Sequence, residues 1–336
     1  MGKQTIRERI PAFASILGLL VLIAVYYIVG VIRDANVAYG LKAIVNQSVV
    51  VALVATGAVF IYTLGSFDIS LGAATGVSAL LGAMAYNATG SLVVMFLVCV
   101  GVAVTVGFIN SSLASVFNLP IFVTTVAMMS VLSAFMLILI GWNGAGDTIK
   151  VKARDVRPLD NIPFKVGILA AYLTLCWFVF TLLPTGREAK FIGGNPVCAR
   201  LSGISEKKLA IIASLISAVG IGLGAFLTIV YAPTLNKDTA SSIGMDVIIA
   251  IVFGGMPVSG GPRSRILAAV VGAFSMGFLT QIMTMLNLGS GFGQMIKAAI
   301  FLAGMPERFA HTGLPPMNFD CRPTGSSVKT NQQSAT

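Results

Sequence analysis

Long apolar runs with very few charges most constrain this chain. Runs of about 20 residues follow one another from residue 12 to residue 305, separated by short polar segments. A helix of about 20 residues is long enough to cross the ~30 Å hydrocarbon core of a bilayer. Only 10% of the residues are charged, whereas a soluble domain carries roughly 25%. The sequence therefore predicts an all-α, polytopic transmembrane helical bundle.

We expect about ten spans. They cover residues 12–32, 43–64, 70–88, 91–116, 120–141, 165–184, 208–231, 245–260, 265–287 and 292–305. Residues 1–11 would be a cytoplasmic N-terminal segment, and residues 12–305 the transmembrane domain. The tail, residues 306–336, is rich in proline, serine, threonine and glutamine. That composition predicts a disordered cytoplasmic segment.

Basic residues set the expected orientation. Lys and Arg outnumber Asp and Glu by 22 to 12, which gives a net charge of +10. These residues stand in short segments between apolar runs, where they determine topology and meet anionic lipid headgroups, so we expect no nucleic-acid partner. More than half of them fall on the side of the N-terminus. We therefore expect a multi-pass membrane protein with both termini in the cytoplasm.

Common catalytic motifs are absent from the sequence. It contains no G-x-x-x-x-G-K-[ST] loop to hold ATP phosphates, no H-E-x-x-H and no G-x-S-x-G. The one histidine, His311, cannot by itself form a His-ligated metal site or an acyl-transfer triad. We expect no catalytic residue, no metal and no cofactor, and any ATP hydrolysis would occur in a separate subunit.

A short capped helix is predicted in the polar segment 185–207. Asn195 is a good N-cap, Pro196 suits the first helical position, and Gly203 suits the left-handed residue after the end. Gly193 and Gly194 allow a tight entry into this helix. A helix of about seven residues is not stable alone in water. It therefore needs support from the membrane face or from a partner protein.

Asp68 lies between two apolar runs, in the stretch Gly-Ser-Phe-Asp-Ile-Ser-Leu-Gly at residues 65–72. A carboxylate in hydrocarbon costs ~2.5–3.5 kcal/mol on insertion scales unless it is hydrogen-bonded or solvated. Asp68 could cap the following helix, whose first N–H groups otherwise have no partner. It could instead contact a solute directly. We favour the capping role.

Two Gly-Gly pairs, Gly254-Gly255 and Gly260-Gly261, flank Pro257 near the end of the eighth run. They predict a non-helical turn, which a membrane protein tolerates only where protein or water covers it. Asp246 precedes this turn, and Lys297 lies early in the last apolar run. We expect Lys297 to pair, to reach the membrane surface or to face the bundle interior.

These three stretches resemble the membrane subunits of ribose/galactose-type sugar ABC importers, a family that includes autoinducer-2 permeases. The family patterns G-G-I-D-L-S-V-G, G-G-N-x-x-A-A-R-L-S-G-I and L-D-A-I-A-A-V-V-L-G-G-T-S-L-S-G-G correspond to residues 65–72, 193–204 and 245–261. The run Gln294-Met295-Ile296-Lys297 also resembles a family pattern. The similarity covers roughly residues 40–305, with the patterns in the family's order and spacing.

The resemblance implies a permease that lacks its own ATPase and has the fold of the vitamin B12 importer, a type II ABC importer. Its partners would be two ATP-binding subunits, an extracytoplasmic solute-binding protein and a second permease subunit, identical or not. The coupling to the ATPase would fall to Gly193, Gly194, Asn195, Pro196, Ala199, Arg200, Leu201, Ser202, Gly203 and Ile204. Roles in the pathway or its structure would fall to Asp68, Ser70, Gly72, Asp246, Gly254, Gly255, Gly260, Gly261 and Lys297.

Departures from the family patterns leave the solute open. Ser66-Phe67 replaces the usual Gly-Ile, and Pro257 and Pro262 are unusual. The expected cargo is a monosaccharide or a similar small polar solute, moved by ATP-driven alternating access. One alternative is an ion-coupled secondary transporter, for which Asp68, Asp246 and Lys297 are the candidate ionisable residues. The other is a membrane scaffold without transport.

Overall fold

The computed structural model describes residues 2–34, 36–142, 148–239, 242–257, 259–289 and 291–299. Within those ranges, seven helices are long and apolar enough to cross a membrane. The prediction of an all-α polytopic protein is confirmed. The tail predicted for residues 306–336 and the end of the tenth predicted span lie outside the described residues.

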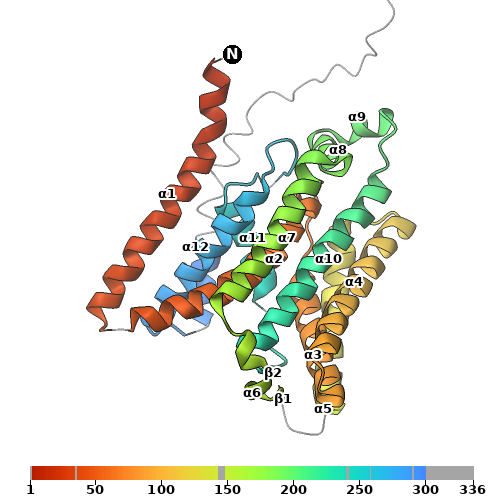
Figure 1. Ribbon diagram of the computed structural model, residues 1–336. Coiled ribbons are helices and arrows are strands. Elements are labelled where there is room, and N and C mark those ends of the chain that lie inside the picture. Colours follow the sequence, from red (N-terminus) through yellow and green to blue (C-terminus); the bar gives the residue numbers. More distant parts are fainter. Residues whose placement is uncertain are drawn as a thin grey trace, which may run out of the picture.

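The long helices begin and end close to the predicted runs (Figure 1). They are α1 (Gly2–Ile32), α2 (Val37–Thr63), α3 (Leu71–Thr89), α4 (Leu92–Phe117), α5 (Ile121–Trp142), α7 (Ile162–Leu182), α10 (Glu206–Tyr231) and α12 (Ile266–Met285). The segment expected before the first span is itself helical, because α1 begins at Gly2. A further helical stretch covers residues 291–299.

One predicted span is much shorter than expected. Residues 245–260 were expected to cross the membrane, but α11 (Ile243–Phe253) has only 11 residues. The helix stops at Gly254, the C-cap, because Gly255 has a φ of +95° and directs the backbone into a turn. An 11-residue helix is ~17 Å long, about half of a ~30 Å hydrocarbon core.

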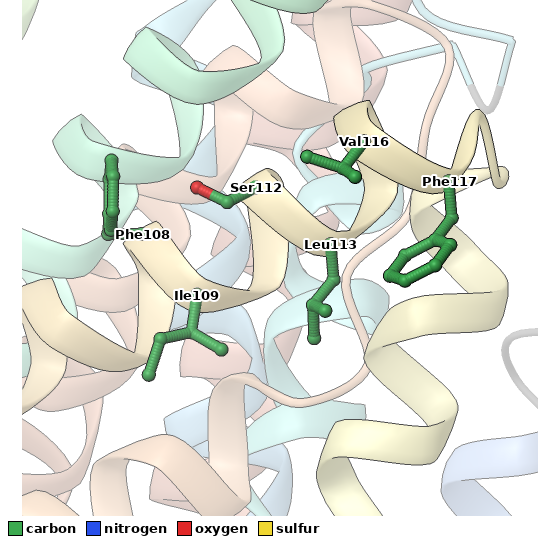
Figure 2. A pocket seen from close by; sticks show the side chains of 6 residues that line it. All are labelled: Phe108, Ile109, Ser112, Leu113, Val116 and Phe117. Atoms are coloured by element: carbon green, nitrogen blue, oxygen red, sulfur yellow. The ribbon is translucent and has the colours of Figure 1, made fainter.

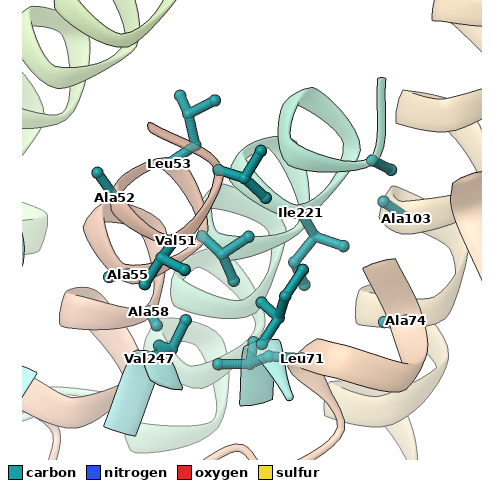
Figure 3. Close-up of a cluster of buried hydrophobic side chains, with 14 of the residues drawn as sticks. Val51, Ala52, Leu53, Ala55, Ala58, Leu71, Ala74, Ala103, Ile221 and Val247 are labelled. Carbon is teal, nitrogen blue, oxygen red and sulfur yellow. The ribbon is translucent and has the colours of Figure 1, made fainter. Parts of the chain in front are cut away.

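Helix α2 lies at the centre of the bundle. In its most apolar part 83% of the residues are buried, against 17% in α1 and α4. Figure 3 shows small and β-branched side chains of α2 in one buried cluster with side chains of α3, α4, α10 and α11. The labelled residues there are Val51, Ala52, Leu53, Ala55 and Ala58 of α2, with Leu71, Ala74, Ala103, Ile221 and Val247. The outer helices α1, α4, α5 and α7 expose large apolar side chains, as lipid-facing helices do.

Small residues bring the backbones of neighbouring helices into contact. A Cβ atom added at Gly272 of α12 would lie 1.7 Å from the carbonyl oxygen of Ala250 in α11. One at Gly220 of α10 would lie 2.6 Å from the carbonyl oxygen of Leu53 in α2. Such contacts stabilise helix association in lipid, where burial of apolar surface gives no driving force.

The two ends of the bundle carry different short elements (Figure 1). The N-terminus lies at the same end as α8 (Pro184–Gly194) and α9 (Pro196–Leu201). The opposite end carries α6 (Ala153–Val156), the 3-10 turn η1 (Arg157–Leu159) and an antiparallel pair of strands, β1 (Thr148–Lys150) and β2 (Thr234–Asn236). The sequence did not predict this strand pair, which joins loops that are distant along the chain.

Candidate functional site

The predicted short helix exists as α9, which follows α8 directly. The side chain of Asn195 accepts hydrogen bonds from the backbone N–H groups of Val197 and Cys198, both at 3.1 Å. Pro196 occupies the first helical position, where the missing N–H costs nothing. The predicted N-terminal cap is therefore confirmed.

The other end of α9 is closed by a Schellman motif. The N–H of Ile204 donates to the carbonyl oxygen of Ala199, and that of Gly203 to Arg200, both at 3.1 Å. Gly203 has a φ of +79°, which favours glycine because it has no Cβ. The Ser202 hydroxyl donates to the carbonyl oxygen of Cys198 at 2.9 Å. A six-residue helix is thus fixed by its caps rather than by its length.

Helix α9 buries one face and exposes the other. Ala199 is 1% exposed, whereas Val197 and Leu201 are 68% and 74% exposed. The Arg200 side chain is also exposed and lies 3.6 Å from Glu206, a separation at which an exposed ion pair contributes little. Two large apolar side chains and a cation therefore project from the end of the molecule, without cover from the described part of the chain.

A contact that we call the glycine joint connects α8 to the bundle. It consists of Gly193, Gly260, Gly261 and the last residue of α2, Thr63. A Cβ added at Gly193 would lie 2.0 Å from the carbonyl oxygen of Thr63, and one at Gly260 2.3 Å from that of Tyr62. The N–H of Gly261 donates to the carbonyl oxygen of Thr63 at 3.0 Å. Two of the stretches singled out in the sequence, 193–204 and 245–261, thus meet the end of α2 through their backbones.

The other glycines of the stretches 193–204 and 245–261 have different surroundings. Gly194 has only the Pro262 ring beside it, 3.4 Å from an added Cβ. Gly254 ends α11 and lies against α12, where an added Cβ would be 1.8 Å from the carbonyl oxygen of Ala268. Gly255 follows it with a φ of +95°. The turn after α11 is thus held between α12 and the glycine joint.

Asp68 does not occupy the N-cap position predicted for it. Ser70 is the N-cap of α3, and Asp68 lies two residues before it. Asp68 Oδ1 accepts hydrogen bonds from the backbone N–H of Ser70 at 2.8 Å and from its hydroxyl at 2.6 Å. The capping prediction is therefore wrong in position, because the non-helical chain extends two residues further than expected. Asp68 instead orders the turn that leads into α3.

Gly72 and Ser70 connect this turn to two other helices. The side-chain amide of Asn110 in α4 donates to the Ser70 hydroxyl at 3.1 Å. Gly72, in the first turn of α3, lies beside Gly244 of α11, where an added Cβ would be 3.4 Å from the Gly72 nitrogen. The beginnings of α3 and α11 are therefore in contact.

Asp246 and Lys297 form a buried ion pair. Lys297 Nζ lies 2.7 Å from Asp246 Oδ1, and both side chains are less than a tenth exposed. A buried carboxylate without a partner would be costly, so each residue accounts for the presence of the other. Of the fates expected for Lys297, pairing is the one that the structure shows.

Comparison with protein families matches residues 40–305 to the family described as branched-chain amino acid transport system / permease component. The chain belongs to this permease family. The match covers the three motif stretches and all the helices from α3 to α12. The resemblance found in the sequence is therefore confirmed.

Named relatives are sugar and autoinducer import permeases. The permease is 24% identical to the ribose import permease of Haemophilus influenzae, over 91% of this chain and 94% of the relative. It is 26% identical to that of Escherichia coli K12, over 86% and 90%. It is 28% identical to the autoinducer 2 import system permease of Photorhabdus laumondii, over 77% and 78%. No solved structure matches the chain.

Sequence reasoning missed Asn110 and the cluster around Lys165. Asn110 is a carboxamide within an apolar run, a signal that could have been used, because polar residues are costly there. Lys165, at the opposite end from α9, is 1% exposed and donates to Asp160 and to Asn46. Lys42 also donates to Asp160, at 2.8 Å. This cluster attaches the loop before α7 to α2 of the permease.

An apolar hollow on α4 lies away from these residues (Figure 2). Its volume is about 230 Å³, and Phe108, Ile109, Ser112, Leu113, Val116 and Phe117 line it. Phe108 and Val116 are 51% and 71% exposed. The hollow is therefore on the outer, lipid-facing surface and offers few groups that could orient a polar solute.

Proposed function

We propose that this permease is the transmembrane subunit of an ABC importer that moves a monosaccharide or a similar small polar solute by ATP-driven alternating access. The names of its relatives support import of a sugar or sugar-like solute. The observation that carries the proposal is α9. It is capped at both ends, apolar on its outer face and connected to the bundle through the glycine joint.

Helix α9 would be the coupling helix, which sits in a cleft of an ATP-binding subunit. Val197 and Leu201 would be buried there, which removes two apolar side chains from water. Its two caps hold α9 rigid. A movement of the ATP-binding subunit would therefore displace α9 as a unit, and α8 with it. The glycine joint would then transmit it to α2 and to the turn that ends α11. Rocking of packed helices is a common way to alternate access.

We propose that the chain crosses the membrane ten times. The seven apolar helices, together with α3, α11 and residues 291–299, give ten segments that pass through the bundle, α11 only part of the way. Ten crossings would leave both termini on one side of the membrane, and we propose that this is the cytoplasmic side, which would also carry α9. We propose the type II importer fold for this arrangement, in the inner membrane of a bacterium.

The proposal requires three kinds of partner. One ATP-binding subunit would bind at α9 of each permease subunit, and an extracytoplasmic solute-binding protein would deliver the solute at the end that carries β1 and β2. A second permease subunit would complete the pathway. The membrane lipid would cover the exposed apolar side chains of α1, α4, α5 and α7.

An ion-coupled transporter is the main alternative. Of its candidate residues, Asp246 already has a cationic partner in Lys297. Asp68 is bonded to Ser70 through one of its two oxygens. No feature of the described residues favours ion coupling over the coupling role proposed for α9. None favours a scaffold without transport either.

Substitution of Arg200 and Gly203 tests the proposal. Arg200→Glu reverses the charge on the exposed face of α9, and Gly203→Val puts a β-branched residue at a φ of +79°, at a cost of roughly 1–2 kcal/mol. We expect both to reduce co-purification of the co-encoded ATP-binding subunit, or to uncouple its ATPase, with normal membrane insertion. Lys208→Ala, an exposed change at the start of α10, is the control. Wild-type association and coupling in both variants would contradict the proposal.

A further inference from the structure

Two helices begin inside the bundle and face each other. An added Cβ at Gly244, in the first turn of α11, would lie 3.2 Å from the carbonyl oxygen of Ile69 and 3.4 Å from the nitrogen of Gly72. Helix α11 runs from this meeting point to the turn at the glycine joint, over ~17 Å for 11 residues. With the glycine joint at the cytoplasmic face, as proposed above, the meeting point would lie near the middle of a ~30 Å bilayer core.

The starts of α3 and α11 both have backbone N–H groups without hydrogen-bond partners. The N-cap residues Ser70 and Ser242 make no side-chain cap hydrogen bond. The first three N–H groups of each helix find no acceptor among the described residues; they belong to Leu71, Gly72, Ala73, Ile243, Gly244 and Met245. Each helix start also carries about half a positive charge from the aligned peptide dipoles.

Acceptors without partners lie beside these donors. Asn110 is 4% exposed, its amide nitrogen is directed at Ser70, and its carbonyl oxygen has no hydrogen-bond partner. Asp68 accepts both of its hydrogen bonds through Oδ1, and Oδ2 receives none from the described residues. A buried polar group without a partner is costly and calls for an explanation. Hydrogen-bond donors and acceptors therefore both lack partners at the point where α3 and α11 begin.

We propose that this meeting point is a solute-binding point on the permeation pathway and that it takes a neutral, polyhydroxyl solute. A hydroxyl group donates one hydrogen bond and accepts others. It could donate to Asn110 Oδ1 or Asp68 Oδ2 and accept from the helix N–H groups. This inference rests on the proposed function and adds to it a place and a ligand chemistry.

Charge favours a neutral solute over an ion. The two helix starts together carry about one positive charge, which the Asp68 carboxylate balances. A carboxylate or a cation would leave an uncompensated charge in a buried place, at a cost that a neutral hydroxyl avoids. The position also suits alternating access. The far end of α11 connects to the glycine joint, so a movement of α9 would separate the two helix starts and open the site.

Replacement of Asn110 tests the site without removal of a cap or an ion pair. Asn110→Leu and the smaller Asn110→Ala both delete the unpartnered carbonyl oxygen. Ser78→Ala is the matched control, because it deletes another buried, unpartnered oxygen from α3, about two turns from its start. The complete importer, with its ATP-binding subunit and binding protein, is reconstituted in proteoliposomes, and uptake of labelled D-ribose and D-galactose is measured together with binding-protein-stimulated ATP hydrolysis.

We expect the maximal uptake rate to fall about tenfold in both Asn110 variants, the effect of ~1.4 kcal/mol. The KM should stay unchanged, since the binding protein captures the sugar, and ATP hydrolysis should stay within about twofold. Ser78→Ala should match the wild type. Wild-type uptake in both Asn110 variants would overturn the site alone, and so would a parallel loss of uptake and ATP hydrolysis, which marks a structural role. Absence of ATP-dependent uptake of either sugar by the wild type would overturn the proposed function, and the site with it.

Discussion

The glycine joint makes a sharp prediction for two adjacent residues, Gly193 and Gly194. Both end α8, and both would become better helix formers as alanine. A Cβ at Gly193 would meet the Thr63 carbonyl oxygen at 2.0 Å and the Gly261 nitrogen at 2.7 Å, whereas one at Gly194 would meet only the Pro262 ring at 3.4 Å. Gly193→Ala must therefore push two backbones apart, while Gly194→Ala fits the space.

The magnitude follows from the kind of contact. Backbone atoms cannot rotate away as a side chain can, so Gly193→Ala should cost ~1–3 kcal/mol, the usual range for overpacking. If the glycine joint transmits movement from α9 to α2, the substitution lowers the coupling free energy between these helices by this amount. A coupling free energy of 1–3 kcal/mol corresponds to roughly 5–150-fold. We therefore expect ATP-dependent uptake to fall by a factor in this range in Gly193→Ala and to change by less than about twofold in Gly194→Ala.

Uptake in proteoliposomes and thermal unfolding of the purified permease together check this prediction. Both variants should insert normally and bind the ATP-binding subunit, because α9 and its caps are unchanged. Equal behaviour of the two alanine variants would refute the reasoning, since only the close approach at Gly193 distinguishes them. A loss of stability in Gly193→Ala with undiminished coupling would show that the joint holds the fold together but transmits nothing.

Three further predictions concern other parts of the permease. Asp246→Asn or Lys297→Met should each destabilise it by about 3–5 kcal/mol in thermal unfolding, because a buried charge loses its partner, whereas leucine at both positions should restore most of the loss. Leu201→Asp should leave unfolding unchanged, because the side chain is 74% exposed, and should weaken co-purification of the ATP-binding subunit. Burial opposes ionisation of Asp160, but Lys165 and Lys42 outweigh it and hold the pKa of Asp160 below its usual value. The stability from this ionised group is therefore present above the usual Asp pKa of about 3.9 and is lost as the pH falls through the lowered value, so Asp160→Asn should flatten the acid limb of a stability–pH curve.

Each of these has a contradicting result. A double leucine variant as unstable as the single variants would show that Asp246 and Lys297 have roles beyond their pairing. Normal co-purification of Leu201→Asp would remove the outer face of α9 from the interface. An unchanged acid limb in Asp160→Asn would mean that the cluster at Lys165 does not contribute to acid stability.

Local features of this permease could be predicted from its sequence, and contacts between distant segments could not. The ends of α9 are determined by the local preferences of Asn195, Pro196 and Gly203, so their roles could be predicted from the sequence. The glycine joint depends on three segments that fold onto one another, and single glycines do not say which backbone they will meet.

The same distinction explains the errors. The apolar run at 245–260 was predicted as a span, but α11 ends early because Gly255 adopts a positive φ angle directly after the C-cap. Asp68 has the residue type of an N-cap, yet Ser70 occupies the N-cap position of α3. The carboxylate of Asp68 accepts a hydrogen bond from the backbone N–H of Ser70. Asn110 stands out in its apolar run, but its partner, Ser70, is known only from the structure.

Dependence of uptake on its energy source tests the central claim most directly. The permease is reconstituted in proteoliposomes with the co-encoded ATP-binding subunit and solute-binding protein, and each component, ATP and ion gradients are withheld in turn. We predict uptake of labelled sugar only when ATP and both partners are present, with no effect of proton or sodium gradients. Uptake by the permease alone, driven by an ion gradient, would contradict the account.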